Sequence, residues 1–317
     1  MIPNKQAYNS YYMQLKAEDI VNNNPVTLEP NKTLYDVRNI LIKYNISRVV
    51  IVEKEKEENK EAIGIITEKD ITRFLFSELP TRHLDEIRID EVIRSRNIIT
   101  AKKDTDISTC AKLMLDNNIS SLIITVNRLN DGSNILGGII TKSDLLDAYV
   151  KSYGGNVTVN EYMTKKVLTV RPDEPVHMVL LIIVDSNISR VIVVQGDGKP
   201  IGIITNHDVL PASTLLLANK TTPYTQYWIK RKDIENNNKG IISRSKGNLP
   251  YGMKRILLAE DIMKFDPIII TDYADLIDAA LIMRGNRISG LPVVDSNNRL
   301  VGIIIKTDIT RAVADGR

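Results

Sequence analysis

A threonine followed three residues later by an aspartate recurs at the end of an apolar run that starts with glycine. The pairs are Thr67 and Asp70, Thr141 and Asp144, and Thr205 and Asp208; a fourth copy keeps Asp308 but has Ile305 in place of the threonine. A threonine at a strand-to-helix junction lies beside free backbone N–H groups, which together with the helix dipole favour a phosphate. An aspartate one turn further on presents two oxygens that can accept both hydroxyls of a ribose. The pattern indicates a site for a sugar phosphate, and the glycine would let the ligand approach the backbone.

The same spacing also has a purely structural interpretation. In a capping box, a threonine caps the first turn of a helix and an acidic residue three positions later bonds back to the cap N–H. The sequence alone leaves both interpretations open, and one aspartate can serve both roles.

A second phrase precedes each of these runs. It reads Asn-Ile-Ser or a close variant followed by apolar residues, at 45–52, 118–124, 187–194 and 287–294. Self-similarity on this scale indicates one supersecondary unit copied four times. Arg48 and Arg190 follow the serine in the first and third copies, where the other two have Ser121 and Gly290. Each arginine is either a ligand contact or a strand residue whose aliphatic part packs on its neighbours.

Each copy reads as a β-α-β-β-α unit. In the first copy we predict a strand at 25–28, a helix with Thr33 as its N-cap, paired strands from the Asn-Ile-Ser phrase and at 63–66, and a helix at 70–76. A charged loop at 53–61 would connect the paired strands. In the second copy we expect a helix at 106–117 that carries Cys110, the only cysteine, as a small buried apolar side chain.

The repeats divide the chain into two halves. We expect an N-terminal arm at 1–16, one module at 17–150 made of repeats 17–76 and 89–150, and a second module at 159–315 made of repeats 159–214 and 259–315. A short glycine-containing stretch separates the halves at 151–156. The second module contains an insertion at 215–258.

These phrases together resemble the cystathionine-β-synthase (CBS) domain family: Asp-Ile-Met or Asp-Ile-Val, Pro-Val-Thr, Ile-Ser-Arg-Val-Val-Ile-Val and Gly-Ile-Ile-Thr-x-x-Asp. The resemblance implies a mixed α/β (α+β) fold in which repeats pair sheet against sheet about a pseudo-twofold axis into two Bateman modules. It also implies clefts that bind adenine nucleotides or, less commonly, S-adenosylmethionine.

The resemblance assigns roles to particular residues. Arg48 and Arg190 would reach ligand phosphates, as a guanidinium suits that geometry. Thr164 matches a small polar position that faces the ligand, where the other repeats have Asn22, Arg94 and Lys264. We expect the clefts at Asp70 and Asp208 to rank first and the cleft at Asp144 next. The cleft at Asp308 comes last because Ile305 lacks a hydroxyl.

Composition narrows the function class. A net charge of +3 with 26% charged residues favours no particular partner, and one cysteine excludes an internal disulfide framework. No apolar run resembles a signal peptide or reaches the ~20 residues of a membrane span. We therefore predict a soluble, cytoplasmic protein that does not contact a membrane. The sequence has no P-loop, no cluster of zinc ligands and no nucleophile with a paired histidine, so we predict no catalysis.

The leading prediction is a regulatory sensor of AMP, ADP or ATP, with Mg²⁺ accompanying a triphosphate. It would act on a regulated protein that the sequence does not identify, or through a homodimer. The alternative rests on the insertion, where Tyr224, Tyr227 and Trp228 precede the basic run 230–232. Basic residues with interleaved aromatic side chains are typical of nucleic-acid contact, although a hairpin packed on the neighbouring repeat is the other interpretation. A scaffold or nucleic-acid-binding protein would act through this insertion.

Overall fold

The computed structural model describes residues 15–56, 59–77, 82–93, 98–126, 135–152, 157–210 and 257–317. Most of the N-terminal arm and of the 215–258 insertion, including Trp228 and the basic run, lies outside these residues. So do Arg94 and the glycines of the stretch between the two halves.

All four repeats follow the predicted order, each behind a short leading helix. Repeat 1 contains α2 (Ala17–Ile20), β1 (Thr27–Leu28), α3 (Leu34–Tyr44), β2 (Arg48–Lys56), β3 (Asn59–Thr67) and α4 (Glu68–Ser77), followed by η1 (Leu84–Glu86). Repeat 2 contains α5 (Ile89–Ile93), β4 (Thr100–Lys102), α6 (Ile107–Asp116), β5 (Ser121–Val126), β6 (Ile135–Thr141) and α7 (Lys142–Ser152). Repeat 3 contains α8 (Val159–Tyr162), β7 (Thr169–Val170), α9 (Val176–Asp185), β8 (Arg190–Val194), β9 (Pro200–Thr205) and a helical segment at 206–210. Repeat 4 contains α12 (Ala259–Ile262), β10 (Lys264–Phe265), β11 (Ile270–Thr271), α13 (Leu276–Gly285), β12 (Gly290–Val294), β13 (Leu300–Ile305) and α14 (Lys306–Asp315).

Repeats 1 and 2 share one six-stranded sheet in the order β1-β2-β3-β6-β5-β4. Within repeat 1, β1 runs parallel to β2, and β2 pairs antiparallel with β3 from Arg48 opposite Thr67 outward. The charged stretch 53–61 was expected to be a loop, and this expectation is wrong. Its described residues continue the β2–β3 pairing as far as Lys56 and Asn59.

Each leading helix packs on the neighbouring repeat of its own module rather than on the repeat that follows it. Ala259 and Met263 of repeat 4 join the core of repeat 3, and Val159 and Tyr162 of repeat 3 join the core that contains repeat 4. Strand β10 likewise pairs with β9 of repeat 3. The exchange places residues of one repeat beside the Thr-x-x-Asp segment of the other.

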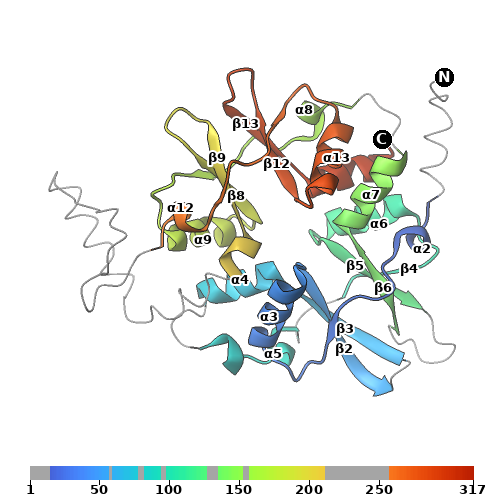
Figure 1. Cartoon of the computed structure of the whole chain (residues 1–317). Coiled ribbons are helices and arrows are strands. Elements are labelled where there is room, and N and C mark those ends of the chain that lie inside the picture. The colour runs from blue at the N-terminus through green and yellow to red at the C-terminus, as the bar shows by residue number, and fades with distance from the viewer. Residues whose placement is uncertain are drawn as a thin grey trace, which may run out of the picture.

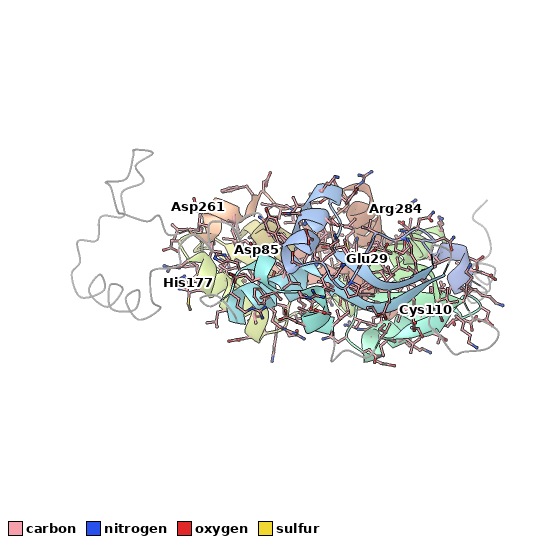
Figure 2. All side chains as sticks on the ribbon, turned by 90° about the horizontal axis from the view of Figure 1, so that it is seen from below. Glu29, Asp85, Cys110, His177, Asp261 and Arg284 are labelled. Carbon is pink, nitrogen blue, oxygen red and sulfur yellow. The ribbon has the colours of Figure 1, made fainter. Side chains whose placement is uncertain are left out.

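Helices hold the two modules together. One apolar core combines α6 and α7 of repeat 2 with α13 and α14 of repeat 4, and another combines repeat 1 with residues of α9 and of the 206–210 segment. Figure 1 shows the resulting ring of four repeats, with α4 next to α9 near its centre and α7 beside α13. Figure 2, at right angles, shows that the described part of the chain is thinner in this direction than across the ring.

Several local expectations are confirmed. The Thr33 hydroxyl accepts a hydrogen bond from the backbone N–H of Asp36 at the start of α3. Cys110 is buried in α6, and burial raises its thiol pKa to about 11. None of the helices among the described residues is long and apolar enough to cross a membrane.

Candidate functional site

Each aspartate of the repeated motif uses one carboxylate oxygen to close the first turn of the following helix. Oδ2 of Asp70 accepts the backbone N–H and the hydroxyl of Thr67, both at 2.8 Å. The same two bonds join Thr141 to Asp144 at 2.7 and 2.7 Å, and Thr205 to Asp208 at 2.8 and 2.6 Å. A carboxylate oxygen has about two acceptor positions, so Oδ2 is saturated. The hydrogen bonds of the capping box are therefore present in these three repeats, and the contact of a carboxylate oxygen with a ribose stays a prediction.

The fourth copy differs as its sequence predicts, but only in part. The backbone N–H of Ile305 still donates to Oδ2 of Asp308 at 2.8 Å, so the return bond of the capping box remains and only the hydroxyl bond is lost. Thr307 does not replace that hydroxyl, because it accepts from Nζ of Lys142 instead. Asp308 is 1% exposed, and burial raises its pKa to about 6. Nη1 of Arg311 lies 3.4 Å from its Oδ1.

The glycine of each motif serves packing between repeats. A Cβ on Gly302 would lie 2.6 Å from Sδ of Met163, and one on Gly202 would overlap Sδ of Met263. Both methionines come from the exchanged leading segment of the partner repeat. The expectation that the glycine leaves room for a ligand to approach the backbone is wrong at these positions, since the partner repeat fills that space.

Arg48 and Arg190 both reach from their own repeat toward the partner repeat of the module. Nη1 of Arg48 donates to the carbonyl of Ser120, and a Cβ on Gly290 would crowd Nη1 of Arg190. Burial lowers the pKa of each guanidinium to about 10, so both stay charged at neutral pH. Glu68 and then Asp144 oppose this shift for Arg48, and Asp308 and then Asp208 oppose it for Arg190. Each arginine therefore lies in the electrostatic field of the partner repeat's aspartate.

Thr164 and its described counterparts in the other repeats pair with a strand of the partner repeat. Thr164 bridges to Ile303 and Asn22 bridges to Ile139, and Lys264 pairs with Ile203 in the same register. These three isoleucines each follow the motif glycine, so Asn22, Thr164 and Lys264 occupy equivalent places. Lys264 differs from the other two because its Nζ lies 3.2 Å from Oδ1 of Asp208.

Two lysines that the sequence analysis missed join this site. Lys142 and Lys306 begin α7 and α14, and they cross between repeats 2 and 4: Nζ of Lys142 donates to Thr307 at 2.9 Å and Nζ of Lys306 donates to Ser143 at 2.8 Å. Burial, with the charge of Arg48 nearby, lowers the Lys142 pKa to about 8, and burial together with Arg190 lowers that of Lys306. We call Arg48, Arg190, Lys142 and Lys306 the central cationic cluster. The available signal was the lysine directly after the threonine position of the motif, which occurs in repeats 2 and 4 but not in repeats 1 and 3.

Repeats 1 and 3 meet through a different pair at the equivalent helix starts. Nδ1 of His207 lies 2.6 Å from Oε1 of Glu68. Burial raises the pKa of Glu68, and the hydrogen bond from His207 opposes that rise. No group of three or more histidine, cysteine, aspartate and glutamate side chains suited to a metal ion occurs among the residues that the structure describes.

Comparison with known proteins places this geometry in context. Protein MJ1225 of Methanocaldococcus jannaschii is 27% identical over 299 residues, which cover 91% of this chain and 95% of that protein. Its crystal structure, described as that of a proposed archaeal homolog of g-AMPK, superimposes with a TM-score of 0.72 at 24% identity, covering 94% of this chain and 99% of that one. An uncharacterized conserved protein of Pyrococcus horikoshii gives a TM-score of 0.58 at 21% identity over 94% of this chain and all (100%) of that one.

A shorter structure aligns with part of the chain. The CBS domain pair of protein MJ0100, solved with 5′-methylthioadenosine and S-adenosyl-L-methionine, is 29% identical, with a TM-score of 0.35, and covers 43% of this chain and 95% of that one. The CBS domain family itself matches residues 17–77, 89–151, 159–214 and 259–315. The chain therefore belongs to the CBS domain family and carries four copies of the domain.

Proposed function

We propose that the protein is a non-catalytic sensor of adenine nucleotides, and that its principal clefts are those at Asp144 and Asp308. The observation that carries the proposal is that Arg48 and Arg190 each reach into the partner repeat, where Nη1 of Arg48 donates to the Ser120 carbonyl and Nη1 of Arg190 lies against Gly290. There the two guanidinium groups interact electrostatically with Asp144 and Asp308, respectively. A carboxylate near a partly buried guanidinium suits a ligand with hydroxyls at one end and a phosphate at the other. This order of clefts differs from the one expected from the sequence.

The two clefts offer a complete set of contacts for a nucleoside phosphate. Oδ1 of the aspartate would accept hydrogen bonds from the ribose, and a neutral polar residue, Asn22 or Thr164, stands opposite. The phosphate would face the arginine and the N-termini of α7 and α14, where the helix dipole favours an anion. S-adenosylmethionine carries a sulfonium cation in place of a phosphate, so the central cationic cluster favours a nucleotide over it.

Nucleotide binding would affect the interface between the two modules through two lysines of the central cationic cluster. Lys142 and Lys306 now donate across repeats 2 and 4, and a phosphate would compete for their ammonium groups. A nucleotide shifts the arrangement of repeats only if it binds one arrangement more tightly than the other. Release of the two cross-repeat bonds would supply that difference, and a regulated protein or a second copy of this chain would detect the altered surface.

Isothermal titration calorimetry of nucleotide-free protein against AMP, ADP, ATP with and without Mg²⁺, S-adenosylmethionine and GTP tests the proposal. We expect saturable binding of an adenine nucleotide that weakens at least tenfold in Asp144→Asn and in Arg48→Gln, because a lost charge-assisted hydrogen bond is worth about 1.5–3 kcal/mol. The exposed Asp173→Asn variant, whose partner is Arg171, is the matched control. Folded protein that binds none of these ligands would refute the proposal.

A further inference from the structure

The motif aspartate of the third repeat has a counter-ion. Nζ of Lys264, at the start of β10, lies 3.2 Å from Oδ1 of Asp208. Oδ2 of the same carboxylate already accepts two hydrogen bonds from Thr205. The ammonium therefore stands at the one oxygen that the capping box leaves for a ligand.

The cleft at Asp144 lacks such a cation among the described residues. Beside Asp308, Nη1 of Arg311 lies 3.4 Å from Oδ1, but it donates its hydrogen bond to the Tyr162 carbonyl. Asn22 and Thr164 hold the same backbone register as Lys264, each beside the residue that follows the motif glycine. Oδ2 of Asp144 is saturated in the same way, but its Oδ1 has no hydrogen-bond partner within the described part of the chain. The chain thus carries the same carboxylate with an ammonium in one cleft and with a neutral side chain in another.

We propose that Lys264 is a specificity-determining residue, which closes the third-repeat cleft to a ribose by holding Oδ1 of Asp208 in an ion pair. The inference rests on the proposed function, and it states that a nucleotide fills the third-repeat cleft after the cleft at Asp144. A carboxylate oxygen offers about two acceptor positions, and a ribose diol needs both of them. With one position held by Lys264, only one hydroxyl can be accepted unless the lysine leaves.

The exposure of the two partners sets the size of the effect. The side chain of Lys264 is 60% exposed, whereas that of Asp208 is 8% exposed. An ion pair with one exposed partner is worth at most about 1 kcal/mol, and by the usual conversion that is about a fivefold change in affinity. The lysine is therefore a modest barrier that a ligand at sufficient concentration displaces. The third-repeat cleft would respond at higher nucleotide concentration than the cleft at Asp144.

A reciprocal exchange of side chains tests the inference. Lys264→Thr gives the third-repeat cleft the residue of its partner cleft, and Thr164→Lys places a lysine opposite Asp308. Adenosine and 2′-deoxyadenosine are titrated calorimetrically against each variant and the unaltered chain. We expect Lys264→Thr to raise the affinity of the weakest class of sites for adenosine up to about fivefold. We expect a smaller gain for 2′-deoxyadenosine, and a loss of adenosine affinity in Thr164→Lys.

Two further variants test whether the gain in adenosine affinity arises at Asp208 and whether it depends on the charge of Lys264. Adding Asp208→Ala to Lys264→Thr should abolish the gain, and Lys264→Arg should keep the affinity of the unaltered chain. The inference is overturned if Lys264→Thr binds adenosine no better than the unaltered chain while that chain still binds the nucleotide. If neither the unaltered chain nor Lys264→Thr binds any adenine compound, the proposed function fails together with the inference.

Discussion

His207 of repeat 3 and Glu68 of repeat 1 form a hydrogen-bonded pair across the boundary between the two modules, with Nδ1 and Oε1 2.6 Å apart. The side chains are 32% and 15% exposed, respectively. At the equivalent helix starts, repeats 2 and 4 instead use the neutral acceptors Thr307 and Ser143 for their lysines. The ring is therefore asymmetric at its centre: one side is joined by a carboxylate and an imidazole, and the other by lysine-to-hydroxyl bonds.

The Glu68–His207 pair should contribute measurably to stability. His207→Ala leaves a largely buried carboxylate without its hydrogen bond, which costs about 1–3 kcal/mol. A double-mutant cycle with Glu68→Ala, measured by urea unfolding, should give a coupling energy of at least about 0.5 kcal/mol. The Arg171–Asp173 pair, with both side chains more than 60% exposed at 71% and 63%, is the control and should couple more weakly. Equal coupling in both pairs would contradict the assigned role of the central contact.

The packing of the motif glycines predicts an effect of adding one methyl group. Gly202→Ala would force a Cβ into Sδ of Met263, and overpacking of this kind costs about 1–3 kcal/mol. Gly196→Ala, which has no neighbour within 4 Å of its added Cβ, should have little effect on the midpoint of thermal unfolding. Adding Met263→Ala to Gly202→Ala should recover part of the loss. If Gly202→Ala unfolds at the temperature of the unaltered chain, the glycine is not needed for contact between repeats.

Buried Asp308 predicts a dependence of stability on pH. Its pKa is raised to about 6 by burial, whereas an unfolded aspartate titrates near about 3.9. The folded state therefore binds the proton more tightly, so this contribution to stability is complete below about pH 4 and is lost as the pH rises through about 6. At pH 7.5, Asp308→Asn should be more stable than the unaltered chain by about 1–3 kcal/mol, and the difference should disappear near pH 4. A stability difference that is equal at both pH values in urea unfolding would contradict this cause.

The repeats, their element order and the capping geometry of Thr67 and Asp70 could be predicted from the sequence because they depend on residues close together in the chain. The exchange of leading helices could not. It brings Lys264 next to Asp208, which lies more than fifty residues earlier in the sequence. Neither residue spacing nor helix propensity predicts on which repeat a short helix packs. Without that exchange, Thr164 and Lys264 would be assigned to the wrong aspartates.

The ranking of the clefts also depends on contacts between repeats that the sequence does not predict. From the sequence, we expected the clefts at Asp70 and Asp208 to rank first and the cleft at Asp144 next. In the structure the guanidinium of Arg48 donates to the Ser120 carbonyl of the next repeat and interacts electrostatically with Asp144. Long arginine side chains readily cross between packed units, so the residue types of a site can be read from one repeat while the site itself is assembled from two.

Lys142 predicts that nucleotide binding takes up a proton. Burial and the neighbouring Arg48 lower its pKa to about 8, so much of it is neutral at pH 8.5 in the free protein. A bound phosphate would favour the ammonium form and raise that pKa, so the nucleotide should bind with uptake of a fraction of a proton. Calorimetric enthalpies of AMP binding at pH 8.5 should then vary with the ionisation enthalpy of the buffer. Lys142→Arg, which stays charged, should keep the affinity but remove the dependence on buffer. A dependence that persists in Lys142→Arg would assign the proton to another group.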